Sequence, residues 1–129
     1  MSFSNWMENY ILNNSVRVGT RYVGLCRNNP GEGATGANCQ EVANTYGYAR
    51  AVATGYWSGA SNGQISNTSA IVFPLATGNW GVVSYFVVCN SGSYGAGNVI
   101  VYGSLSAARS ITKYSRPQFS PGQLRITLS

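Results

Sequence analysis

The sequence contains no histidine and no aspartate, and its only acidic residues are Glu8, Glu32 and Glu41. A Ser-His-Asp triad or a Cys-His nucleophile therefore lacks its base. A zinc site of the H-E-x-x-H type is absent, and three cysteines without a histidine are too few for a structural zinc site. A calcium loop needs several acidic ligands close together, which no stretch supplies. We therefore expect neither a metal ion nor another cofactor.

Glu32 and Glu41 are the two carboxylates that a glycosidase mechanism would have to use. One lies in a glycine-rich loop and the other beside the next expected strand, and no pattern fixes the distance between them. We therefore expect both side chains to be solvated, and we predict that the protein is not an enzyme.

Charge of either sign is scarce, since charged residues make up 9% of the chain, against about 25% in typical soluble domains. Eight lysines and arginines against three glutamates give a formal charge of +5, without a run of five or more basic residues. Such a diffuse positive charge suits an acidic protein surface or serves solubility. We expect no specific nucleic-acid partner.

The three cysteines, Cys26, Cys39 and Cys89, allow either one disulfide with a spare thiol or three free thiols. Residues 1–13 lack the charged start and long apolar run of a signal peptide, so we expect folding in a cytoplasm. Disulfides are rare there, which favours free thiols. No apolar run reaches the about 20 residues that a membrane-spanning helix needs, so we expect no membrane association.

One helix is expected, at the N-terminus. Ser4 is suited to cap a helix over residues 5–12, in which Met7, Tyr10 and Ile11 share one face. A helix this short is marginal in water, so its apolar face must dock. We favour docking on the protein's own sheet, and docking on a partner is the alternative.

From Thr20 onward the hydrophobic pattern has a period of two, which is typical of strands. The expected strands cover residues 21–27, 47–56, 64–66, 69–73, 80–89, 98–105 and 124–128. Residues 106–111 either extend the strand before them or bend away, and a loop is expected between Pro117 and Pro121. Asn62-Gly63 is a strong turn signal.

Residues 80–89 are apolar on both faces, which predicts a central strand covered on both sides. Simple alternation places Val83 with Val87 on one face, opposite Phe86 and Val88. Seven or eight short strands at this spacing are typical of a sandwich or barrel. We therefore predict a single all-β domain over residues 1–129, with a helical segment at 1–14 and a β domain at 20–129.

Several segments resemble small virion proteins of tailed phages. Residues 63–74, GQISNTSAIVFP, are similar to a segment of the form G-x-I-S-N-T-x-A-I-x-F-P in that family, and residues 76–83, ATGNWGVV, are similar to A-T-x-x-W-G-T-V. The resemblance extends to YVGLC at 22–26, GNVIVYG at 97–103 and the N-terminal helix, so it covers most of the chain. The cysteines and the single acid in the first long loop depart from the family pattern. The family supplies no catalytic residues.

The resemblance implies a structural protein of a phage virion, assembled in the host cytoplasm. We predict a capsid cement (decoration) protein on the capsid exterior that clamps neighbouring major capsid subunits and stabilises the head. The alternative is a tail or tail-fibre component, either an adaptor or a module that binds host glycans. A free lectin or nucleic-acid-binding domain is a third reading. The expected partners are the major capsid protein or tail proteins, together with a second copy in a homodimer or other symmetric homo-oligomer.

The predicted contact surface combines exposed aromatic side chains, the longest loop (28–38) and one arginine. Aromatic side chains are favoured at protein interfaces, long loops in compact domains are often functional, and arginines pair with carboxylates. The candidate contact residues are Trp6, Tyr10, Asn28, Asn29, Pro30, Tyr114, Arg116 and Phe119.

Overall fold

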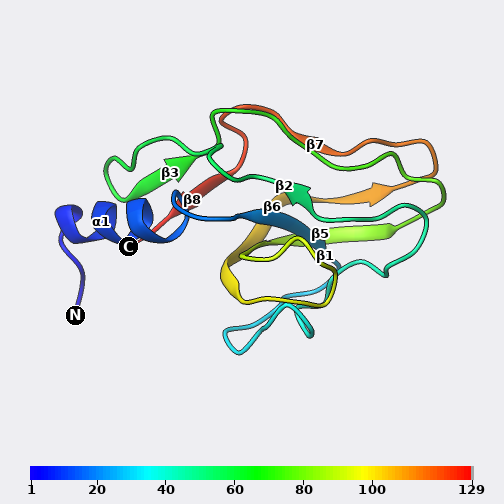
Figure 1. The fold of residues 1–129 in the computed structure, drawn as a ribbon, viewed down its shortest axis with the longest axis horizontal. Helices are drawn as coiled ribbons and strands as arrows, with labels where there is room; N and C mark the ends of the chain where they lie inside the picture. The colour runs from blue at the N-terminus through cyan, green and yellow to red at the C-terminus, as the bar shows by residue number, and fades with distance from the viewer. Residues whose placement is uncertain (129) are drawn as a thin grey trace.

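The computed structural model describes residues 1–128 and contains one helix and eight strands, all paired antiparallel (Figure 1). The helix is α1 (Asn5–Ser15), and the strands are β1 (Tyr22–Cys26), β2 (Ala51–Val52), β3 (Gln64–Ser66), β4 (Ile71–Val72), β5 (Gly81–Cys89), β6 (Val99–Ile111), β7 (Gln118–Phe119) and β8 (Arg125–Thr127). They form one four-stranded sheet in the order β2-β1-β5-β6 and two two-stranded sheets, β3-β8 and β4-β7. The predicted all-β class with one N-terminal helix is confirmed.

The start of the helix agrees with the sequence, because the Ser4 hydroxyl accepts a hydrogen bond from the Met7 amide at 3.3 Å. The helix continues to Ser15, three residues beyond the expected end. The expected docking face is wrong. Glu8 and Leu12, one turn apart, are buried, whereas Tyr10 is 52% exposed.

Polar contacts explain why this other face docks. The side-chain oxygens of Asn9 and Asn13 accept hydrogen bonds of 2.9 Å from the backbone amides of Gly63 and Ala60. They therefore tie α1 to the Asn62-Gly63 turn, where both residues have the positive φ that a two-residue hairpin turn requires (54° and 69°). The hydrophobic pattern alone carried no sign of these contacts.

The predicted central strand is confirmed, since β5 lies between β1 and β6. Residues 86–89 are buried, but Val82 is 50% exposed, so the strand is covered on both sides only in its C-terminal half. The pairing of β5 with β6 is irregular between Val83 and Tyr85. Such an irregularity reverses the alternation, so Val83 joins the main core with Phe86 and Val88 instead of lying opposite them.

The two faces of the four-stranded sheet bury different clusters. The main core contains Val23 and Leu25 of β1 together with Phe73 and Ile126. The opposite face carries a smaller cluster of Cys26, Cys39, Val87 and Cys89. The long segment between β1 and β2, residues 27–50, supplies Cys39 to this second cluster and therefore helps to cover the second face.

Two other expectations need correction, and one open alternative is decided by the structure. Of residues 47–56 only β2 is a strand, because Gly47 and Gly55 have positive φ values (79° and 74°) that interrupt extended backbone. The segment between Pro117 and Pro121 is not a plain loop, since β7 pairs there with β4. Residues 106–111 extend β6 rather than bending away. No helix within residues 1–128 is long and apolar enough to cross a membrane.

The two residues of β4 provide a test of the core. Ile71 is fully buried in the main core and Val72 is 41% exposed. Ile71→Ala is expected to lower the free energy of unfolding by about 2–5 kcal/mol, because it leaves a cavity. Val72→Ala, the matched control, should cost about 0.5 kcal/mol or less. Urea unfolding measures both, and equal losses would contradict the core assignment.

Candidate functional site

The most elaborate polar cluster is a buried ion pair between Glu41 and Arg50. The Arg50 Nη2 atom lies 2.9 Å from Glu41 Oε1, Nε lies 3.0 Å from Oε2, and the two side chains are 4% (Glu41) and 0% (Arg50) exposed. The Tyr48 hydroxyl donates to Glu41 Oε2 and accepts from the Leu25 amide at 3.0 Å. The expectation that Glu41 is solvated is therefore wrong, whereas Glu32 is exposed as expected.

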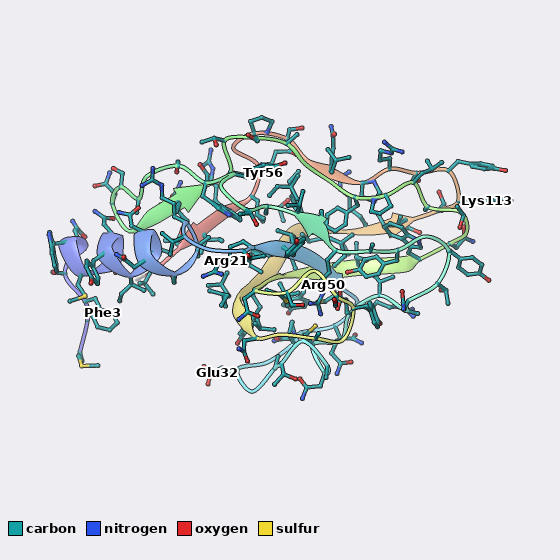
Figure 2. The ribbon with its side chains drawn as sticks, viewed as in Figure 1. Phe3, Arg21, Glu32, Arg50, Tyr56 and Lys113 are labelled. Carbon is teal, nitrogen blue, oxygen red and sulfur yellow. The ribbon has the colours of Figure 1, made fainter. Side chains whose placement is uncertain are left out.

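The remaining donors of Arg50 join two loops. Its Nη1 atom donates to the carbonyl oxygens of Ser91 and Ala96 at 2.8 Å each, and Nη2 donates to that of Gly36 at 3.1 Å. A Cβ atom at Gly36 would lie 1.9 Å from the Ala96 oxygen, so only glycine allows this close approach. Figure 2 shows Arg50 above the 28–38 loop and Glu32 out on that loop.

The protonation states of Tyr48 and Arg50 are fixed near neutral pH. Burial, reinforced by the charge and hydrogen bond of Glu41, raises the pKa of the Tyr48 hydroxyl. Burial alone would lower the pKa of Arg50, but the hydrogen bonds and charge of Glu41 outweigh it, and the net shift is upward. A phenol that stays protonated and a guanidinium that stays charged hold structure and do not exchange protons with a substrate.

The three cysteines are free and buried, as favoured from the sequence. The hydrogen bond with Cys39, with burial next, raises the pKa of the Cys26 thiol. Burial raises the pKa of Cys89 to about 11. Both thiols stay protonated at neutral pH, and a protonated, buried thiol is a poor nucleophile. Within residues 1–128, no group of three or more cysteine and glutamate side chains is arranged so that it could hold a metal ion.

The structure places the predicted contact residues in separate regions. Trp6 and Tyr10 stack on α1 with ring centroids 5.4 Å apart, and Trp6 is 69% exposed. Tyr114 is 72% exposed beside Lys113, at the opposite end of the molecule from Phe3 (Figure 2).

The other predicted contact residues differ in exposure. Asn28, Asn29 and Arg116 are exposed, and Pro30 is half-buried. Phe119 packs edge-on against Phe73 and Phe86 in the core. The eight residues therefore do not form one continuous surface.

A cleft that the sequence analysis missed lies beside β6. Its volume is about 810 Å³, and most of its lining residues lie within 104–111 and 115–125. Arg109, Arg116 and Arg125 line it, and no acidic residue does. Of these arginines only Arg116 belongs to the predicted contact residues, and Phe119, another of the predicted contact residues, also lines the cleft. Arg109 lies on β6 and Arg125 on β8, and no local sequence pattern indicates that they share a cleft.

The ion pair generates a prediction about stability. Arg50→Met and Glu41→Gln should each lower the free energy of unfolding by about 3–5 kcal/mol, because each leaves one buried polar partner unpaired. The double variant should lose less than the sum of the two. Glu32→Gln, the exposed control, should change it by about 0.5 kcal/mol or less. Additive losses in the double variant would show that the two side chains do not act as a pair.

The buried thiols generate a second prediction. A water-soluble aromatic disulfide, whose released thiolate absorbs light, should modify no cysteine of the native protein on the minute timescale, because all three thiols are buried. All three should react once guanidinium unfolds the chain. Rapid reaction of one cysteine per molecule of native protein would mean that the cysteine cluster opens to solvent.

One comparison with known proteins identifies a family. A family model described as "Podophage GP4 fiber I protein gp80" matches residues 2–127, which is nearly the whole chain. No curated protein matches the chain. The family match agrees with the resemblance to small tailed-phage virion proteins found in the sequence. The chain belongs to the podophage GP4 fiber I protein gp80 family and is a structural protein of a tailed-phage virion.

Proposed function

We propose that this protein is a subunit of a virion fibre and that it acts by binding other molecules, without catalysis. The family match over residues 2–127 carries this proposal. The placement of the two candidate carboxylates supports it, because Glu41 is taken up by Arg50 and Tyr48 while Glu32 stands exposed on a loop. A glycosidase needs two carboxylates that face one substrate.

The family description favours the tail-fibre alternative over the predicted cement role. It names a fibre protein, whereas the cement role requires a protein that lies across neighbouring capsid subunits. The cement role, the position on the capsid exterior and the two-fold dimer stay predictions. Measurements on particles decide between the two roles.

The attachment surface that we propose consists of Phe3, which precedes the helix, and of Trp6 and Tyr10 on the outer face of α1. These side chains are 47%, 69% and 52% exposed, although they are large and apolar. The opposite face of α1 already docks through Glu8 and Leu12. Exposed aromatic side chains that cluster on one face are typical anchors of protein interfaces. We therefore assign this face to contact with another virion protein.

The location is tested by counting and imaging copies on purified particles. A fibre subunit should be present in tens of copies or fewer per particle, and gold-labelled antibody should mark projecting fibres in electron micrographs. Hundreds of copies spread evenly over the head would overturn the fibre role and support the cement role.

The attachment surface is tested with Trp6→Ala/Tyr10→Ala. Alanine favours helix, so the double variant should fold with an unchanged melting temperature. It should be lost from particles, because the stacked rings that anchor the contact are gone. Tyr114→Ala, which removes an equally exposed ring at the other end, should leave occupancy unchanged. Full occupancy of the double variant would show that α1 is not the attachment surface.

A further inference from the structure

The cleft beside β6 holds three arginines that the fold itself does not engage. The side chains of Arg109 and Arg116 make no hydrogen bond or ion pair to any other of residues 1–128, and the Arg125 side chain makes one hydrogen bond of 3.3 Å, to the Gly122 carbonyl. Arg21 and Arg50, by contrast, donate several hydrogen bonds to the backbone. The guanidinium groups in the cleft are therefore available to a ligand.

The charge of the cleft selects an anion. None of the residues that line it is acidic, and the three glutamates of the chain are placed elsewhere. Glu8 is buried on α1, Glu41 is paired with Arg50, and Glu32 lies on the 28–38 loop. Arginine binds carboxylates through paired hydrogen bonds, and nothing within the cleft competes for them.

The remaining lining mixes hydroxyl, amide and apolar groups, and this mixture suits a sugar, which itself presents hydroxyl groups and apolar C–H faces. Its polar side chains are mostly small hydroxyls and amides: Ser104, Ser106, Ser110, Ser115, Gln118 and Gln123. The half-buried side chains of Leu105 and Phe119 add apolar area. The volume of about 810 Å³ lies within the roughly 300–1,000 Å³ of small-ligand sites.

The backbone of β6 supplies further polar groups at this place. Tyr85 of β5 pairs with Ser104, but Val83 pairs with Arg109. Residues 105–108 therefore have no Cα partner on β5, and the regular ladder does not account for their N–H and C=O groups. A ligand rich in hydroxyl groups can use such donors and acceptors.

We propose that this cleft binds an acidic polysaccharide of the host surface, with Arg109, Arg116 and Arg125 holding its carboxylates and the serine and glutamine side chains holding its hydroxyls. The polysaccharide assignment rests on the proposed fibre role, because a projecting fibre is the part of a virion that meets the host surface. The anionic character of the ligand rests on the cleft alone.

The test measures binding of polygalacturonate oligomers to the purified protein by calorimetry. Polygalacturonate should bind, and neutral dextran oligomers of the same length should not. Arg109→Gln/Arg116→Gln/Arg125→Gln should weaken binding at least about tenfold, because the charge-assisted hydrogen bonds are lost. Arg17→Gln/Arg27→Gln/Lys113→Gln removes the same charge at exposed positions outside the cleft, and its affinity should stay within about twofold of the unchanged protein. Melting temperatures check that both variants fold.

Three results would overturn the proposal. Equal losses in the two triple variants would mean that general positive charge, and not the cleft, attracts the ligand. Absence of binding to polygalacturonate would rule out an acidic polysaccharide as the ligand of the cleft. Tighter binding of polyglutamate or single-stranded DNA would assign the cleft to an acidic peptide or a nucleic acid. The fibre role is tested separately on particles, so a protein that binds polygalacturonate but coats the head would refute the fibre role and leave the anionic cleft standing.

Discussion

One guanidinium group determines how the second face of the central sheet is covered. Arg50 pairs with Glu41 and donates to three backbone carbonyls on two separate loops. Buried carbonyls without a donor are costly, and long glycine-rich loops have few side chains that could supply one. Arg50 thereby supplies hydrogen bonds to loop carbonyls that in a helix or strand would come from backbone N–H groups. The packing of Cys39 against Cys26 and Val87 depends on it, since the 27–50 segment brings Cys39 there.

The features that the sequence predicted correctly are those decided by a few neighbouring residues. Ser4 caps α1 because its hydroxyl reaches the Met7 amide three residues later. Asn62-Gly63 turns because both residues tolerate positive φ. β5 is central because its own composition leaves its second half no exposed face. In each case the physical cause lies within the segment, so a single sequence was sufficient.

The features that the sequence did not predict depend on residues brought together from distant segments. Glu41 looked solvated because nothing local identifies Arg50, nine residues away, as its buried partner. The prediction of which face of α1 is buried was wrong, because the hydrophobic pattern of the helix does not report hydrogen bonds to the Asn62-Gly63 turn, about fifty residues later. The cleft needs Arg109 and Arg125 from two strands that do not pair with each other. Hydrophobic periodicity reports burial, but it does not report which polar groups meet.

The scarcity of acidic residues links the interior of the protein to its surface. Two of the three glutamates are buried, and Glu41 neutralises only Arg50. Most of the remaining basic side chains therefore face solvent without a carboxylate from residues 1–128 beside them. Exposed unpaired arginines contribute little to stability, so folding does not account for three of them in one cleft. A cleft of one charge sign raises the local concentration of oppositely charged ligands. The same shortage of acids thus leaves the cleft with charge of one sign, and this is the physical basis of the proposed anion binding.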